Sequence, residues 1–189
     1  MGFWKKAWDF IWNDDSLLSW IVNLVLAFII VKFIIYPGIG LMLGTSYPLV
    51  AVVSSSMEHK ENFDEWWFDN SFFYAKYNIT KEDFADFRFR NGFNKGDIMV
   101  LKGKEAKDIK TGDVVVYENT FNRNPIIHRV IRIEKKEGFY FITKGDNNPV
   151  EDQLKVSEDQ IERTGTAVFR IPILGYIKIM FTSLMGVFF

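Results

Sequence analysis

The pattern of apolar and polar positions predicts a membrane-crossing helix near the start of the chain. From Leu17 to Ile35 the sequence is apolar except at Ser19, Asn23 and Lys32. At about 1.5 Å per residue, a helix over this stretch is roughly 28 Å long, close to the hydrocarbon thickness of a bilayer. A stretch of this length and composition is typical of a transmembrane anchor.

Two other interpretations fit this apolar stretch less well. A cleaved signal peptide has a shorter apolar region of about 7–15 residues and ends at small residues, whereas Tyr36, Pro37 and Gly38 follow here. A buried core helix is the second alternative, but a small domain rarely buries a helix that is apolar on every side. Trp20 and Tyr36 suit the two membrane interfaces, so we expect residues 17–36 to be the anchor.

The flanks of the anchor suggest its orientation. Lys5 and Lys6 precede it, and the acidic residues beside them count little in the positive-inside rule. We expect residues 1–16 to be cytoplasmic and the rest of the chain to lie outside the cytoplasm. The segment 171–189 is again mostly apolar, which fits a second span, an interfacial segment or a packing element of the domain. Of these we favour interfacial contact.

Between the two apolar segments the pattern indicates β-strands. Short β-branched and aromatic runs alternate with Gly-Asp turns or charged loops; they cover Ile98–Leu101, Val114–Tyr117, Ile126–Ile133, Phe139–Thr143 and Thr166–Ile171. The fold class we expect is mainly β: a single-pass N-terminal transmembrane helix followed by an antiparallel β catalytic domain over 37–170, without a large cap domain.

Residues 58–90 depart from the strand pattern and are expected to be an insertion loop. Acidic residues and aromatic residues are mixed between Glu58 and Tyr74. One interpretation is a solvated loop whose aromatic residues pack on the domain. The other is an interfacial loop that dips aromatic side chains into the membrane, which the acidic residues oppose. Only the stretch around 81–87 suggests a short helix.

Composition narrows the chemistry. The 189 residues hold 23 Lys+Arg and 24 Asp+Glu, a net charge of −1. The chain therefore lacks the excess of basic residues that would indicate a nucleic-acid partner. Cys is absent, which excludes disulfide scaffolds, Cys-ligated zinc, iron–sulfur clusters and thiol nucleophiles. Imidazole chemistry is limited to His59 and His128.

Three stretches together supply a hydroxyl, an imidazole and a carboxylate; they are 53–58, 127–130 and 144–152. A Ser hydroxyl is a poor nucleophile until a base takes its proton, and the pKa of His suits that task near neutral pH. Ser56, His128 and either Asp146 or Asp152 are thus candidates for nucleophilic acyl transfer. His59 is a rival base. A metal site using both His residues is a further alternative, although no HExxH pattern supports it.

These stretches resemble the sequence boxes of type I signal peptidases, in the archaeal and endoplasmic-reticulum branch. The nucleophile box of that family reads approximately Ser-Gly-Ser-Met-Glu-Pro, and this chain has Ser54-Ser55-Ser56-Met57-Glu58-His59 soon after its anchor. Further boxes follow in family order: Lys95-Gly96-Asp97, Thr111-Gly112-Asp113, Ile127-His128-Arg129-Val130 and Lys144-Gly145-Asp146-Asn147-Asn148-Pro149. Bacterial relatives have Lys where His128 stands.

Two departures from the family pattern concern the nucleophile box. Ser55 replaces the usual Gly, and a backbone position that required positive φ would strain it. His59 replaces the usual Pro. The insertion that follows is longer than in the reticulum enzymes, whereas the short interval from His128 to Asp146 leaves no room for the extra cap domain of many bacterial relatives.

The resemblance implies a membrane-bound serine endopeptidase that cleaves N-terminal signal peptides after small residues at positions −1 and −3. It implies Ser56 as nucleophile, His128 as general base, and Asp152, before Asp146, as the residue that orients His128. It also implies that the Ser56 amide and the Ser54 hydroxyl bind the oxyanion. No cofactor and no metal are implied.

The expected partners are signal-peptide-bearing preproteins and the lipid bilayer, with the protein translocation channel as a further candidate. The expected location is the cell membrane, or the endoplasmic-reticulum membrane of a eukaryote, with the catalytic domain on the non-cytoplasmic side. The alternative function is a catalytically silent, membrane-anchored β module that scaffolds a secretion or processing complex. A peptidase dedicated to one class of surface protein is a narrower third possibility.

Overall fold

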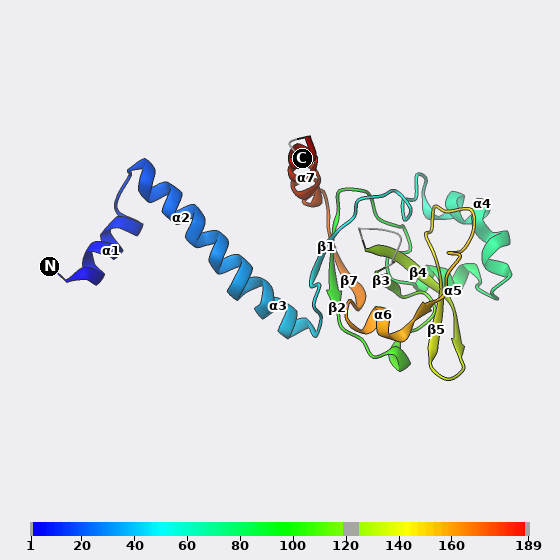
Figure 1. Cartoon of the computed structure of the whole chain (residues 1–189). Helices are drawn as coiled ribbons and strands as arrows, with labels where there is room; N and C mark the ends of the chain where they lie inside the picture. Colours follow the sequence, from blue (N-terminus) through cyan, green and yellow to red (C-terminus); the bar gives the residue numbers. More distant parts are fainter. Residues whose placement is uncertain (1, 119–124, 188–189) are drawn as a thin grey trace. The chain divides into compact units, whose positions relative to one another are not determined.

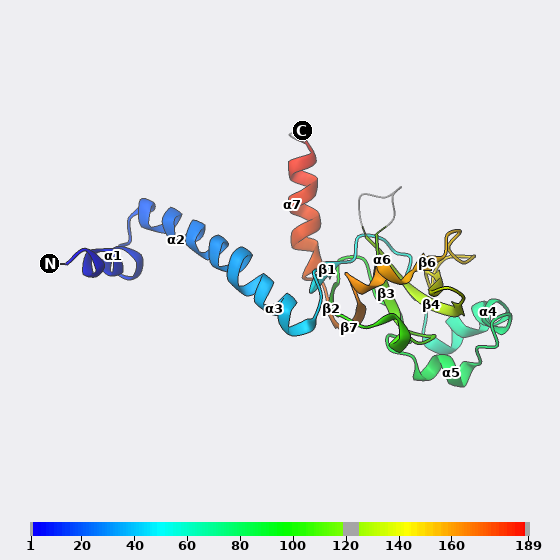
Figure 2. The same cartoon turned by 60° about the horizontal axis from the view of Figure 1, so that its bottom comes forward.

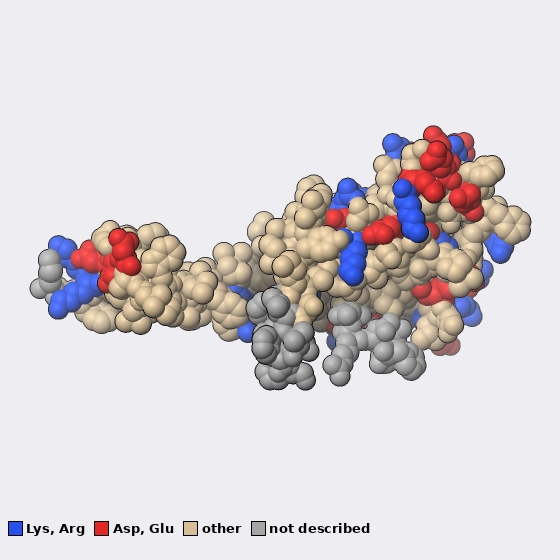
Figure 3. Space-filling model, turned by 90° about the horizontal axis from the view of Figure 1, so that it is seen from above, with Lys and Arg blue, Asp and Glu red and all other residues tan. Residues whose placement is uncertain are grey.

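The computed structural model describes residues 2–118 and 125–187. Contacts divide the chain into an N-terminal unit, up to Met42, and a larger unit from Leu43 onward, and each is described separately. In the N-terminal unit, α1 (Phe3–Trp12) precedes a continuous helix made of α2 (Leu17–Ile30), the π-helical turn η1 (Val31–Ile35) and α3 (Tyr36–Leu43). Figure 3 shows charged side chains gathered at the α1 end, with the rest of this unit largely tan.

The long helix begins where the sequence predicts, because the Ser16 side chain caps it by accepting a hydrogen bond from Ser19 N at 3.2 Å. Among the described residues, Leu17–Leu43 is the one helix long and apolar enough to cross a membrane. It ends at Leu43 rather than at Tyr36. The wider turn of η1 ends at Ile35, two residues before Pro37, where it accommodates a residue that cannot donate a backbone hydrogen bond.

The larger unit is built on a seven-stranded antiparallel sheet of order β1-β2-β7-β3-β4-β5-β6. The strands are β1 (Leu49–Ala51), β2 (Ile98–Lys102), β3 (Val114–Tyr117), β4 (Ile126–Lys135), β5 (Phe139–Lys144), β6 (Val156–Ser157) and β7 (Thr166–Ile171). The fold prediction of an antiparallel β core after an apolar helix is confirmed, and helices around the sheet make the domain mixed α/β. The short helices η2 (Ala106–Asp108) and α6 (Glu158–Glu162) lie in its connections.

The predicted insertion loop contains two helices: α5 (Lys81–Asp86), where the sequence suggested a short helix, and α4 (Phe63–Ala75), which the sequence did not suggest. Asn62 caps α4, and Asp64 and Glu65 occupy its first turn, where the helix dipole favours acidic side chains. Both helices lie beside β4 and β5 in Figures 1 and 2. They form one buried cluster with that face of the sheet: Trp66, Trp67, Tyr74, Ile79, Phe84, Ile131 and Ile142.

Two more clusters fill the rest of the core. One joins β1, β2, β3 and β7 around Met57, Phe93 and Met99. The other lies on the second face of β3, β4 and β5 around Val115, Val130 and Phe141. Because β4 is covered on both faces, its neighbouring side chains point into different surroundings.

The C-terminal helix α7 (Gly175–Val187) follows β7 and lies beside β1 in Figures 1 and 2. Its start is fixed to the turn before β2: Gly175 N donates to Gly96 O at 2.8 Å. A side chain at Gly96, which has φ +91°, would collide with the Tyr176 ring. Several large apolar side chains at this end are exposed: Phe169, Ile173, Leu174, Ile177 and Met180. Phe188 and Phe189, the last residues of the predicted apolar segment, lie outside the described residues.

Candidate active site

The turn that carries Ser56 follows the edge strand β1 and is held from two sides. Glu58 N donates to Ser55 O at 3.1 Å, which closes the turn. Asn147 N donates to Ser56 O at 2.8 Å, and Phe93 N donates to Met57 O at 3.0 Å. Met57 is completely buried. The backbone on both sides of the Ser56 hydroxyl is therefore fixed by separate segments of the domain.

Ser56, His128 and Asp152 lie in one hydrogen-bonded row. Ser56 Oγ is 3.1 Å from His128 Nε2, and His128 Nδ1 is 2.7 Å from Asp152 Oδ2. An ionised carboxylate only accepts, so Nδ1 carries the hydrogen and the Nε2 lone pair faces the Ser56 hydroxyl. This tautomer is the one that can take the hydroxyl proton.

Asp152 is held by two further donors that sequence reasoning missed. Thr143 Oγ1 donates to Asp152 Oδ2 at 2.6 Å, and Tyr117 OH donates to the same oxygen at 2.9 Å. Burial acts to raise the pKa of Asp152, but the hydrogen bonds from His128, Thr143 and Tyr117 outweigh it and lower that pKa. Burial and the Asp152 charge raise the pKa of Tyr117, so its hydroxyl stays a donor. The one sequence feature that could have indicated these donors is Thr143, a polar residue at the end of a predicted strand.

Asp146, the other candidate acid, lies in a different network. Arg129 Nε donates to its Oδ1 at 2.9 Å and Arg129 Nη2 to its Oδ2 at 2.7 Å. Tyr74 OH and His59 Nε2 lie 3.4 and 3.1 Å from the same carboxylate. Burial acts to raise the pKa of Asp146, but the Arg129 charge and the hydrogen bonds hold it well below its usual range.

Strand alternation explains why the two acids differ. His128 and Arg129 are neighbours on β4, and Arg129 pairs with Lys144 while Val130 pairs with Thr143. Successive residues point to opposite faces, so His128 and Thr143 share the face that holds Asp152. Arg129 and Lys144 share the face that holds Asp146.

Lys144 is a buried cation beside this second network. Its Nζ donates to Gly145 O at 3.0 Å and to Asp146 O at 3.1 Å, and it lies over the rings of Phe73 and Tyr74. Burial lowers the pKa of Lys144 from 10.5 to about 8. No feature of the sequence indicated that this side chain is buried.

A cleft of about 460 Å³ opens at the Ser56 hydroxyl. Its walls come from the β1 end, the start of β4 and the acid box: Ala51, Val53, Ser54, Ser56, Pro125, Ile126, Ile127, His128, Asn148 and Asp152. Ser54 Oγ is 3.1 Å from Ser56 Oγ, so its hydroxyl lies beside the attacking atom. Ser55 is not one of the residues with positive φ, and the strain considered for it is absent.

Among the described residues, the rival base His59 and the Asp residues of the two Gly-Asp boxes do not contact Ser56 or His128. The His59 ring contacts Asp146 and Trp66 rather than Ser56. Asp97 Oδ2 accepts from Asn94 N at 2.9 Å and Asp113 Oδ2 from Lys110 N at 2.8 Å, so both carboxylates hold turns.

A hydroxyl, an imidazole and a carboxylate in this order, on a cleft beside an edge strand, form the arrangement of a serine peptidase. No family model matches the chain. It is 29% identical to signal peptidase complex catalytic subunit SEC11 of Komagataella phaffii, over 90% of this chain and 87% of the relative. It is 28% identical to SEC11 of Scheffersomyces stipitis, over 80% and 75%, and 27% identical to SEC11C of Canis lupus familiaris, over 77% and 63%. Over most of its length the chain is therefore similar to catalytic subunits of the signal peptidase complex.

Proposed function

We propose that this chain is a membrane-anchored serine endopeptidase that removes N-terminal signal peptides from exported preproteins, with Ser56 as nucleophile. The observation that carries the proposal is the row from Ser56 Oγ through His128 to Asp152, with separations of 3.1 and 2.7 Å. Homology to signal peptidase catalytic subunits gives the substrate class.

The geometry supports a two-stage reaction. Ser56 Oγ attacks the carbonyl carbon of the scissile peptide while its proton passes to His128 Nε2. The resulting tetrahedral intermediate collapses, the C–N bond breaks, and His128 returns the proton to the leaving amine. Water then attacks the carbonyl carbon of the Ser56 ester and gives a proton to His128. As the ester C–O bond breaks, His128 passes this proton to Ser56 Oγ, and the signal peptide leaves as a carboxylic acid.

We assign the oxyanion to the Ser56 amide and the Ser54 hydroxyl. In other proteases, loss of one such donor lowers kcat about 10²- to 10³-fold. Asp152 is proposed to hold the His128 tautomer and to stabilise the imidazolium that forms. Asp146 is proposed to act on the nucleophile turn through its backbone neighbours rather than on His128.

Substrate access follows from the sheet edge. β1 is the first strand in the sheet order, and Ala51 and Val53 at its end line the cleft. An extended peptide can add to an exposed strand edge through main-chain hydrogen bonds. We further propose that this cleft takes small residues at positions −1 and −3, as the family resemblance implies.

For the membrane, we propose that the Leu17–Leu43 helix anchors the chain, with residues 1–16 cytoplasmic and the sheet domain on the non-cytoplasmic side of a cell or reticulum membrane. The apolar side chains of Ile173, Ile177 and Met180 at the start of the C-terminal segment are exposed, which supports interfacial contact. The translocation channel is a proposed partner in supplying substrate.

The test is cleavage of a preprotein with an Ala-X-Ala site by the purified full chain in detergent. Wild type should cut after the second Ala, Ser56→Ala should not, and Ser55→Ala serves as the matched control in the same turn. If Ser56→Ala cleaves like wild type, the nucleophile assignment is wrong. If folded wild type leaves the preprotein intact, the scaffold function takes its place.

A further inference from the structure

Two buried side chains link the helical insertion to Asp146, beside the nucleophile turn: Tyr74 of α4, whose OH donates to Asp146 Oδ1 at 3.4 Å, and His59, which makes the closer contact. Its ring stacks on Trp66 of α4, with centroids 3.8 Å apart and planes 8° from parallel. Its Nε2 lies 3.1 Å from Asp146 Oδ2, and 1% and 0% of the two side chains are exposed. Because the carboxylate accepts, His59 Nε2 donates.

The burial of the His59 ring reduces folding stability, because one of its two ring nitrogens loses its hydrogen bonds to water and, within the described part of the chain, gains none in return. Its Nδ1 is buried and has no hydrogen-bond partner within the described residues 2–118 and 125–187. A buried polar atom without a partner destabilises a fold by about 1–3 kcal/mol. An apolar side chain at this position would avoid that cost, but it would not bond to Asp146.

The backbone around Asp146 in turn holds the nucleophile turn. Asn147 N donates to Ser56 O at 2.8 Å, and Asn147 Nδ2 donates to Ser55 O at 3.0 Å. Asp146 N lies 3.3 Å from the sulfur of Met57. A shift of Asp146 therefore moves the backbone that carries the Ser56 hydroxyl.

We infer that the insertion of α4 and α5 is a positioning element for the nucleophile, acting from Trp66 through His59 and Asp146 to Ser56. This inference rests on the proposed peptidase function. Reacting groups must be aligned closely, and a displacement of about 1 Å lowers rates about 10²-fold. The insertion thus supports catalysis without contacting the substrate.

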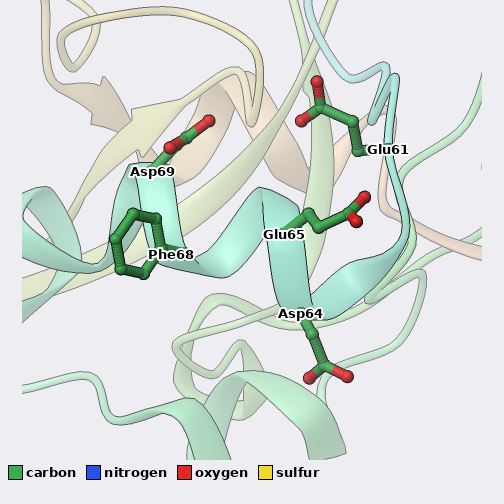
Figure 4. A pocket seen from close by; sticks show the side chains of 5 residues that line it. All are labelled: Glu61, Asp64, Glu65, Phe68 and Asp69. Atoms are coloured by element: carbon green, nitrogen blue, oxygen red, sulfur yellow. The ribbon is translucent and has the colours of Figure 1, made fainter.

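The two faces of α4 supply an internal control. Trp66 is 4% exposed, whereas Phe68 is 83% exposed. Figure 4 shows Phe68 together with Glu61, Asp64, Glu65 and Asp69 around an outer pocket of this helix. Substitution of Phe68 changes the helix surface and leaves the His59 contact in place.

The experiment compares His59→Gln with His59→Asn in the full chain in detergent. The Gln amide reaches the position of Nε2, whereas the Asn amide is one methylene shorter. We expect His59→Asn to lower kcat for preprotein cleavage at least ten-fold with KM within two-fold of wild type. His59→Gln should restore kcat to within about three-fold of wild type. Trp66→Leu should lower kcat as His59→Asn does, and Phe68→Ala should not.

Hydrogen exchange at the Asn147 amide provides a readout that does not need activity. Exchange should be faster in His59→Asn and Trp66→Leu than in wild type, His59→Gln and Phe68→Ala. If wild type does not cleave, the proposed function fails while this exchange still tests the positioning. Wild-type kcat and exchange in both His59→Asn and Trp66→Leu would overturn the inference. The inference would also be overturned if His59→Gln and His59→Asn lost kcat equally and the loss matched the fall in their melting temperatures. If His59→Asn does not fold, Trp66→Leu decides the outcome.

Discussion

Replacing Asp152 and Asp146 separately by Asn distinguishes the carboxylate that supports catalysis from the one that supports folding stability. Asp152 Oδ2 accepts hydrogen bonds from His128, Tyr117 and Thr143. Asp152→Asn removes the charge that faces the imidazolium. Two unit charges about 4 Å apart interact by about 4 kcal/mol at an effective dielectric constant of about 20, which corresponds to roughly 10³-fold in rate. If the Asn amide instead donates to Nδ1, the tautomer reverses, and an equivalent change in another serine protease costs about 10⁴-fold.

Asp146→Asn acts mainly on stability, and it affects kcat only through the position of the nucleophile turn. Arg129 is completely buried, and its guanidinium donates to both Asp146 oxygens. Loss of one partner of a buried ion pair typically destabilises a protein by 3–5 kcal/mol. We therefore expect Asp152→Asn to lower kcat by 10³- to 10⁴-fold at nearly unchanged KM. Asp146→Asn should show the larger loss of unfolding free energy.

The assay is steady-state cleavage of a preprotein alongside urea unfolding of each variant in the same detergent. The reasoning is refuted if Asp152→Asn keeps wild-type kcat. It is also refuted if Asp146→Asn loses as much kcat as Asp152→Asn while its unfolding free energy is unchanged.

Three other predictions follow from buried groups near the site. The pKa of Lys144 is about 8 in the folded chain, against 10.5 for an unperturbed lysine. Between these pH values the unfolded chain binds more protons than the folded chain, so the free energy of unfolding rises with pH. Relative to Lys144→Met, wild type should gain about 2–3 kcal/mol of unfolding free energy between pH 6 and pH 10, and a difference that is flat with pH would contradict this. A Cβ at Gly145 would lie 2.7 Å from Ser56 O and 2.8 Å from His128 Nε2, so Gly145→Ala should lower kcat at least ten-fold; wild-type kinetics would show that the site yields. Phe84 is 0% exposed and Phe72 is 79% exposed; Phe84→Ala should cost about 3–5 kcal/mol in urea unfolding and Phe72→Ala less than about 0.5, and equal losses would refute the packing we describe.

Much of the fold was predictable because its strands carry strong local signals. β3 and β7 have the predicted bounds, and β2, β4 and β5 differ from prediction only at their C-terminal ends. The start of the long helix was predictable from its apolar run. Its end was not, because Pro37 usually ends a helix and here follows the π-helical turn η1.

Helix α4 escaped prediction for a different physical reason. Aromatic and acidic residues alternate around it, so no single apolar stripe is visible. Trp66 and Trp67 are buried although adjacent, while Phe68 and Phe72 are exposed. The cap at Asn62 and the acids after it are helix-start signals, but their mixture with aromatic residues resembled a loop.

The residues of the candidate site could be predicted from residue type and family resemblance, but the contacts among them could not. Sequence left Asp146 and Asp152 both open as partners of His128. The choice depends on which strand face each acid reaches, and that follows only from the register of β4 with β5. The sequence also does not show which polar side chains are buried around the site, and three of them are His59, Tyr117 and Lys144.

Covalent trapping of the nucleophile tests whether Ser56 is the residue that attacks the substrate. A peptide diphenyl phosphonate with Ala at the position of cleavage is incubated with the full chain in detergent, and the adduct is mapped by tandem mass spectrometry. We expect a phosphonylated Ser56, with labelling strongly slowed by His128→Ala. An adduct on another residue, or efficient preprotein cleavage by an enzyme that the probe leaves unlabelled at Ser56, would contradict it.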